Sequence, residues 1–236
     1  MPELMLNSYR LREIADATIG QNWEVELSAY IERLRLKSAV IREYISERER
    51  TEQGRRDFIR LCFTARRHCD SILSGNTAEE IDSAIDSLSS SDTDPERCIS
   101  LFMSLKGAPP EVLMDLAYEM IHFSYPARYG LATRWVWNPS NGTGALREAI
   151  AAEKRPISFE QVQKVMKSIA ASLAVHGYRF KDFIPVDLMS ALYYSQDVIG
   201  AKDNSMNAGG MEALFPNHGV ISTMILGIRR IHRANP

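Results

Sequence analysis

The chain has 236 residues, of which 45% are apolar and 25% are charged, and it contains 13 glycines and 10 prolines. This composition is close to the average of folded proteins, and it excludes disordered, collagen-like and low-complexity chains. The 28 basic and 30 acidic residues nearly cancel, so no overall field directs the chain to nucleic acid or to an anionic membrane. The length is that of one or two domains.

Compartment signals favour a cytoplasmic protein. The three cysteines form no Cys-x-x-Cys pair, and an odd number without that motif favours a reducing compartment over a disulfide framework. The N-terminus carries charges where a signal peptide needs an apolar core. The most apolar stretch, residues 220–228, is about half the length of a membrane span. We therefore expect no membrane association.

The first elements in chain order are helices. A short amphipathic pattern over residues 11–19 ends at Gly20, and two longer patterns follow over residues 23–50 and 55–73. In both of the longer patterns apolar residues recur at steps of three and four, and Gly54 between them predicts a break. Two such helices joined by a short polar turn predict a long antiparallel hairpin, with one bent helix as the alternative.

A linker is predicted near the middle of the chain. Thr77 and Glu80 have the spacing of a capping box, and they predict a helix that runs to about residue 88. The sequence SSSDTDP at residues 89–95 has no apolar residue, and its proline suits the first turn of another helix. We accordingly predict an N-terminal helical hairpin region over residues 1–90 and a C-terminal helical domain over residues 91–236.

The second half also consists of helical patterns. They cover residues 98–105, a segment that starts at Pro109 and Pro110, a segment from Ser158 to residue 177, and a segment from Pro185 to Gly200. A polar loop over residues 201–210 and a closing helix over residues 220–232 are predicted after them. No segment alternates at the period of a strand. The predicted fold class is all-α, a multi-helix bundle.

No catalytic or metal-binding motif stands out. The phosphate-binding, nucleophile-elbow and zinc-protease motifs are absent, and no cofactor is implied. Glu119 and His122 have the Glu-x-x-His spacing of di-iron bundles, but the chain has no second copy. With Glu111 and Asp115 they form a polar stripe, which we interpret as a solvated helix face. No catalytic residue can be assigned.

Charge is distributed unevenly along the chain. Basic residues outnumber acidic ones over residues 33–67, whereas residues 68–100 hold eight acidic residues and one basic residue, Arg97. Such blocks indicate either helix faces that neutralise one another or a basic face offered to an acidic partner. Arg55 and Arg56 are the candidate contact residues of the basic block.

Aromatic residues concentrate in one segment. Six of the twenty aromatic residues lie between residues 118 and 137, beside two arginines. Tryptophan, tyrosine and arginine are enriched at binding hot spots, although large aromatic rings also build helical cores. Core packing is the favoured interpretation and a partner or ligand groove is the alternative. The candidate partner-binding residues are Arg128, Tyr129, Arg134, Trp135 and Trp137.

These observations favour a non-enzymatic accessory or adaptor protein that binds another macromolecule, most readily a protein. One alternative is an α-helical enzyme or ligand-binding protein with a pocket near residues 125–137. A second is a nucleic-acid-handling protein that uses the basic face at residues 48–67, which is less favoured because acidic residues alternate with the arginines. Self-association through the N-terminal helices is a further expectation.

Overall fold

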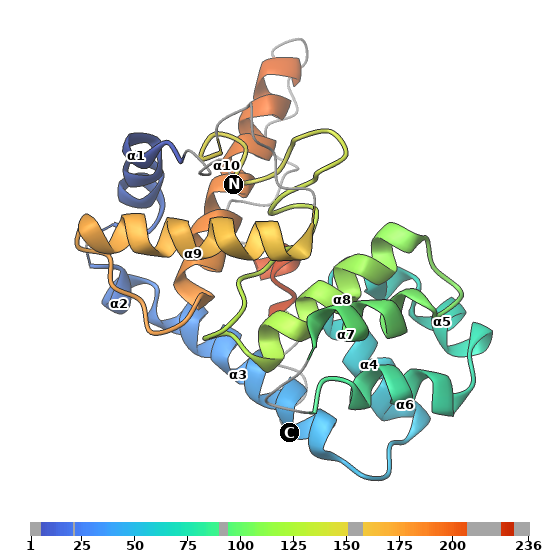
Figure 1. Cartoon of the computed structure of the whole chain (residues 1–236). Coiled ribbons are helices and arrows are strands. Elements are labelled where there is room, and N and C mark those ends of the chain that lie inside the picture. The colour runs from blue at the N-terminus through green and yellow to red at the C-terminus, as the bar shows by residue number, and fades with distance from the viewer. Residues whose placement is uncertain (1–5, 21, 90–93, 151–157, 207–222, 229–236) are drawn as a thin grey trace.

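The computed structural model describes residues 6–20, 22–89, 94–150, 158–206 and 223–228 (Figure 1). In these ranges the regular structure consists of ten α-helices and one 3-10 helix. The β pairing of the described residues is limited to two isolated bridges, Leu6–Ile150 and Asn138–Thr143. The predicted all-α fold is confirmed. Among the described helices, none combines the length and the apolar character that a membrane crossing requires.

The longest described stretch without a regular helix, residues 125–150, lies between α8 and α9. In the first half they are α1 (Ser8–Thr18), α2 (Trp23–Glu26), α3 (Ser28–Ser46), α4 (Glu52–Leu61), η1 (Ala65–Arg67), α5 (Cys69–Gly75) and α6 (Ala78–Asp86). In the second half they are α7 (Pro95–Met103), α8 (Pro110–Ser124), α9 (Phe159–Val175) and α10 (Ile184–Met206).

Two groups of helices share the long helix α3. In Figure 1, helices α4 to α8 gather at one end of the molecule, whereas α1, α9 and α10 lie at the other end. Helix α3 contacts α8 of the first group and α10 of the second. A single hydrophobic cluster includes residues of both groups, among them Leu34 of α3, which is fully buried as its helical spacing predicts.

The long N-terminal hairpin is not confirmed. A separate short helix, α2, precedes α3, and the second predicted long helix is divided into α4, η1 and α5. Helix α4 ends because Cys62 is extended, with φ −80° and ψ 125°. The carbonyl oxygen of Leu61 then accepts a hydrogen bond from the Lys37 ammonium at 2.9 Å. A contact distant in sequence therefore uses a backbone acceptor that a continuous helix would need.

Gly54 does not separate the helices, contrary to the sequence prediction. The chain turns before it, and Thr51 caps α4 by accepting a hydrogen bond from the Gly54 amide at 3.0 Å. A β-carbon at Gly54 would lie 2.8 Å from Cε2 of Tyr44. The glycine therefore allows close packing of the Tyr44 ring on the first turn of α4.

Most predicted helix starts are confirmed, because they depend on local capping. Both reciprocal bonds of a capping box are present at Thr77 and at Ser158, and Pro95 and Pro110 lie in the first turns of α7 and α8. One predicted end is wrong, since α10 continues past Gly200 to Met206. A single glycine costs a helix only about 1 kcal/mol, which tertiary packing readily offsets.

Two predicted segments lie largely outside the described residues. In the predicted linker, these are residues 90–93. In the predicted closing helix, only residues 223–228 are described. The division of the chain at residue 90 into two regions stays a prediction.

Candidate anion-binding site

The polar stripe of α8 is buried, which corrects its interpretation as a solvated face. Asp115, Glu119 and His122 are 1%, 2% and 0% exposed, whereas Glu111 at the start of the helix is exposed. Helix α8 lies between α3 and α7, so both its apolar and its polar side face other parts of the protein. Buried charges require partners, and each of these three residues has one from a distant segment.

Asp115 binds Arg134. Its Oδ1 accepts a hydrogen bond from the Arg134 backbone amide at 2.9 Å, and its Oδ2 accepts from Nε and lies 2.9 Å from Nη2. Burial raises the pKa of Asp115, although the bonds from Arg134 oppose that effect. The arginine is therefore a structural partner of α8.

Glu119 pairs with Lys37 of α3 in the interior of the protein. The Lys37 ammonium donates to the Glu119 carboxylate and to the carbonyl oxygens of Leu61 and Leu226, at 2.9 and 2.8 Å for the carbonyls. It also lies 4.3 Å from the centre of the Phe123 ring. All three N–H donors of the ammonium thus have acceptors, which joins α3, α4, α8 and the segment 223–228.

His122 faces an oxygen atom at each ring nitrogen. Nδ1 lies 2.7 Å from the carbonyl oxygen of Tyr129, and Nε2 lies 3.0 Å from Oδ2 of Asp187 in α10. This arrangement suits the imidazolium form, which has two N–H donors. Burial alone would lower the pKa of His122, but the Asp187 carboxylate and the Tyr129 carbonyl together raise it. The pKa of Asp187 is also raised, in this case by burial itself, because burial disfavours the charged carboxylate.

These buried groups are poorly suited to catalysis. The His122 ring is fully buried, and each of its nitrogens lies within 3.0 Å of a protein oxygen, so a substrate cannot reach it to give up a proton. Burial raises the pKa of the Cys62 thiol well above its ordinary value, which disfavours the nucleophilic thiolate. Among the described residues there is no group of three or more His, Cys, Asp or Glu side chains that could hold a metal ion.

Several buried polar side chains instead bind the non-helical segment over residues 125–150, which we name the buried loop. Buried backbone amides and carbonyls outside helices need side-chain partners. Gln163 of α9 bonds both backbone groups of Gly130, accepting from its amide at 2.7 Å and donating to its carbonyl at 2.9 Å. Oδ1 of Asp187 accepts from the Leu131 amide at 3.1 Å. Asp115 and His122 also bind backbone groups of this loop.

The aromatic residues nominated from the sequence lie mostly in the core. Tyr129, Trp135 and Trp137 are 8%, 8% and 2% exposed, because the buried loop turns them inward. Arg134 is directed to Asp115, as described above. Arg128 alone among the nominated residues of this segment is well exposed, and its guanidinium lies 5.2 Å from the centre of the Tyr129 ring.

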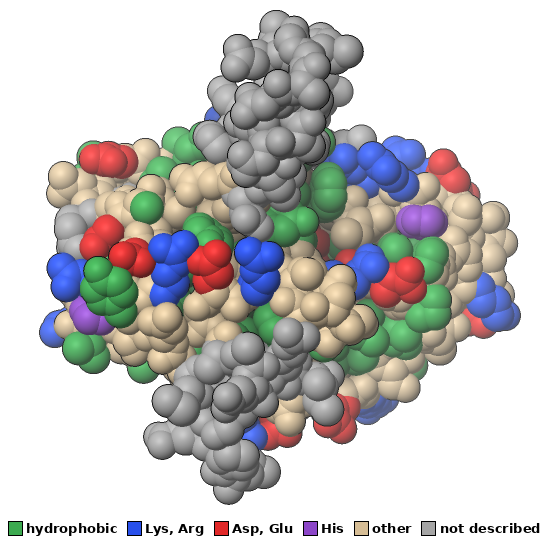
Figure 2. Space-filling model, turned by 90° about the horizontal axis from the view of Figure 1, so that it is seen from above, with side chains coloured by type: hydrophobic (Ala, Val, Ile, Leu, Met, Phe, Trp, Pro, Cys, Tyr) green, Lys and Arg blue, Asp and Glu red, His purple; other side chains and the backbone are tan. Residues whose placement is uncertain are grey.

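The nominated arginines of the basic block have acidic partners within the chain. Arg55 donates to both carboxylate oxygens of Asp82 in α6, and Arg56 pairs with Glu52 and Asp70. The basic and acidic blocks of the sequence thus neutralise one another here. On the face seen in Figure 2, basic and acidic side chains also alternate rather than forming a patch of one sign.

A cationic pocket of about 470 Å³ opens beside Arg128. Three segments form it: α3, the end of α8 with the turn after it, and the turn before α10. A backbone bond from the Phe183 amide to the Pro126 carbonyl, 2.9 Å long, holds the last two segments together. Four basic residues and one acidic residue line the pocket, a net charge of +3. They are Arg35, Arg42, Arg128, Lys181 and Asp182.

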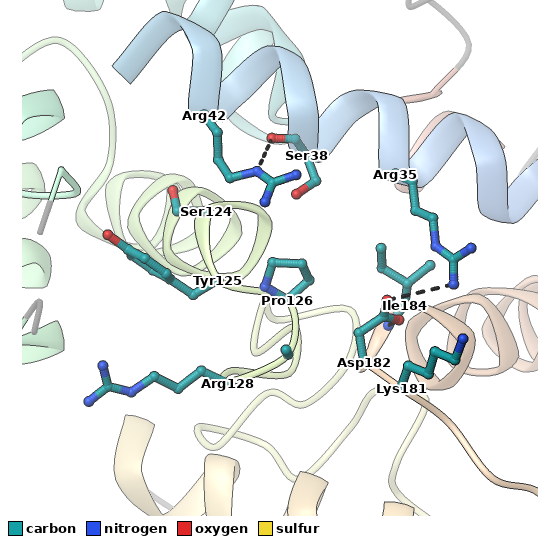
Figure 3. A pocket seen from close by; sticks show the side chains of 11 residues that line it. Arg35, Ser38, Arg42, Ser124, Tyr125, Pro126, Arg128, Lys181, Asp182 and Ile184 are labelled. Atoms are coloured by element: carbon teal, nitrogen blue, oxygen red, sulfur yellow. Dashed lines mark hydrogen bonds and ion pairs between the residues drawn. The ribbon is translucent and has the colours of Figure 1, made fainter. Parts of the chain in front are cut away.

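Figure 3 shows how these side chains are arranged. Arg35 and Arg42 extend from α3 on either side of Ser38, and Arg35 lies 3.7 Å from the Asp182 carboxylate. Arg42 donates from Nε to the Ser38 carbonyl at 3.3 Å, which leaves its other N–H groups directed elsewhere. Arg128 extends away from Arg35, at the edge of the pocket.

The charge of this pocket is only partly neutralised. Neither Arg42 nor Lys181 forms an ion pair with any described residue. The buried Ser38 and Ser124 direct their hydroxyls to backbone carbonyls of α8, so they fix the wall and leave ligand binding to the basic groups. A concave surface with several cations suits a phosphate or a carboxylate.

The sequence suggested, as an alternative, a pocket near residues 125–137. Of the four basic residues that line the cationic pocket in the structure, only Arg128 was among the candidates from the sequence. Arg35 and Arg42 lie in a predicted helix with several other basic residues, so nothing in the sequence distinguishes them. Lys181 lies in a turn without a recognisable motif. Their spacing of seven residues, two helical turns, does place the two arginines on one face of α3. The comparisons with known proteins add no assignment: no family model, no curated protein and no solved structure matches this chain.

Proposed function

We propose that this protein is a non-enzymatic binding protein whose cationic pocket takes the phosphate or carboxylate group of a small ligand. One observation carries the proposal: a pocket of about 470 Å³ with a lining charge of +3, in which Arg42 and Lys181 have no acidic partner among the described residues. A pocket of this size falls within the range of small-molecule sites. Unneutralised cations in a concavity attract anions most strongly.

The contrast with the other arginines supports this choice. Arg55, Arg56 and Arg134 each lie against a carboxylate, so binding an external anion there would first require breaking an internal ion pair. In the pocket, the ion pair described is that of Arg35 with Asp182, at the longer distance of 3.7 Å. The pocket is therefore a more favourable anion site than the basic block at residues 48–67.

The wider roles expected from the sequence remain predictions. An adaptor role would need a surface other than the buried aromatic rings, and self-association would use the N-terminal helices. A cytoplasmic location is supported by three cysteines that are free and buried.

Binding can be measured by calorimetry and by thermal shift with inorganic phosphate and with citrate. A ligand at about 100 times its dissociation constant should stabilise the folded chain by about 2.7 kcal/mol. Arg42→Ala and Lys181→Ala should each weaken binding about tenfold, in the range of one charge-assisted contact. The matched control is Lys167→Ala, which removes an exposed lysine of α9 that lies outside the pocket.

The double variant Arg42→Ala/Lys181→Ala should bind neither anion and should unfold at the temperature of the unmodified protein. Equal affinity in the control and in both single variants would place anion binding elsewhere. No stabilisation by either anion at low ionic strength would reject the proposed function.

A further inference from the structure

A second cavity adjoins the cationic pocket. It has a volume of about 280 Å³ and lies between α2, α3 and the turn before α10. Arg35 and Lys181 line both cavities, so the two spaces share a wall. We refer to these two adjoining cavities, which both lie along α3, as the groove.

The groove follows a single face of α3. Ser28, Glu32, Arg35, Ser38 and Arg42 line it at successive steps of four, three, three and four residues. Such steps align side chains along one side of a helix. At a rise of 1.5 Å per residue, the stretch from Ser28 to Arg42 is about 21 Å long, several times the width of a phosphate group.

Charge changes sign along this groove. The charged residues that line only the cationic pocket are two arginines and one aspartate, Arg42, Arg128 and Asp182, which sum to +1. Those that line only the second cavity include two glutamates and one arginine, Glu24, Glu32 and Arg179, which sum to −1. The shared residues between them add two positive charges. The groove is therefore most positive at its centre and on the side of Arg42, and it becomes acidic towards α2.

We propose that the ligand is elongated and bipolar, with an anionic group beside Arg35, Arg42 and Lys181 and an ammonium group beside Glu24 and Glu32. This inference rests on the proposed function, because it assigns the second end of the same ligand. Both glutamates are exposed at the surface, and neither forms an ion pair with a described residue. An ammonium at that end gains two carboxylates, whereas a second anion there would meet them and be repelled.

The test uses matched series of synthetic phosphates. Alkyl phosphates and ω-aminoalkyl phosphates of equal chain length, from two to twelve methylene groups, are titrated against the full chain by calorimetry at low ionic strength. The aminoalkyl member should bind about threefold to fivefold more tightly, as expected for an exposed ion pair, and only above the length that reaches Glu32. α,ω-Alkane bisphosphates of the same lengths test the opposite charge pattern.

Three variants separate this inference from the proposed function. Glu32→Gln should reduce the advantage of the amine, the double variant Glu24→Gln/Glu32→Gln should abolish it, and both should leave the affinity for alkyl phosphate unchanged. Glu26→Gln, an exposed residue of α2 that does not line the groove, should preserve that advantage. If alkyl phosphates bind but the amine adds nothing at any length, or if bisphosphates bind more tightly, the bipolar ligand is rejected and the proposed function stands. If no phosphate binds, the bipolar ligand is rejected too, and the proposed function itself fails when citrate also does not bind.

Discussion

Helix α3 carries two kinds of cation that differ in role although they lie side by side in the sequence. Lys37 turns into the protein, where its ammonium has a carboxylate and two carbonyl oxygens as partners. Arg35 and Arg42, on another face of the same helix, line an open pocket. Burial of a charge demands complete pairing, whereas a charge at the surface can remain available to a ligand because water solvates it.

The comparison extends to the two regions to which these residues belong. The residues of the polar stripe of α8 pair with side chains from distant segments of the same chain. These residues should therefore govern stability. In the cationic pocket, Arg42 and Lys181 have no acidic partner among the described residues, so the residues of this pocket should govern binding. Substitutions in the two regions should therefore separate these two properties, and the largest effects on unfolding should come from the interior.

Lys37→Met should have the greatest effect on stability. It removes the ammonium that donates to the buried Glu119 carboxylate and to two backbone oxygens, and removal of one member of a buried pair costs about 3–5 kcal/mol. Urea denaturation followed by circular dichroism measures the loss. Lys37→Met/Glu119→Leu should recover part of it, because that second change removes the unpaired charge. A loss below about 1 kcal/mol for the single variant would contradict the pairing.

His122→Gln should remove a pH dependence as well as about 2 kcal/mol of stability, the range for a buried group left unsatisfied. The pKa values of His122 and Asp187 are both raised in the folded chain, so the folded state holds its protons more tightly than the unfolded state. The contribution of the histidine is complete below its ordinary pKa of 6.5, and it is lost as the pH rises through the higher folded value.

The free energy of unfolding, measured from pH 6 to pH 9, should thus fall more steeply for the unmodified protein than for His122→Gln. His176→Gln, at the partly exposed end of α9, is the control and should keep the steep slope. Parallel slopes for all three proteins would mean that the buried pair does not titrate in this range.

Arg134→Ala should destabilise the protein by about 1–2 kcal/mol, since it leaves the buried Asp115 with only the backbone amide as a donor. The size of this loss distinguishes a structural arginine from one at a binding surface, for which a change below about 0.5 kcal/mol is usual. Thermal denaturation is sufficient for the measurement. Unchanged stability together with weakened partner binding would return Arg134 to the role considered from the sequence.

Arg42→Ala should have the smallest effect on stability, below about 0.5 kcal/mol, because its one described hydrogen bond is to a carbonyl at 3.3 Å. Its effect should be on phosphate affinity instead. If Arg42→Ala unfolded as readily as Lys37→Met, the contrast between the two faces of α3 would not hold.

Local signals explain what could be predicted. Capping residues such as Thr77 and Ser158 act on amides three positions away, so sequence spacing is enough to locate the helix starts. Leu34 likewise follows from periodicity. The end of α4 could not be predicted in this way, because it depends on Lys37, twenty-four residues before Leu61.

The candidate site shows the same limit. The stripe of Asp115, Glu119 and His122 has the spacing of a solvated face, and sequence cannot show that α3 and the buried loop cover it. Its partners are 19, 82 and 65 positions away. The pocket gathers residues 35, 42, 128 and 181, so only Arg128 fell within the segment that sequence reasoning singled out.

The sequence by itself determined the all-helical fold and most helix starts, because these depend on contacts within one or two turns. It also provided the balance of charge, in which an acidic block follows a basic one. Only the tertiary structure decided which charges are closed into pairs and which line the groove. Helix packing determines this, because a buried charge is stable only where packing brings a partner from elsewhere in the chain within hydrogen-bonding distance.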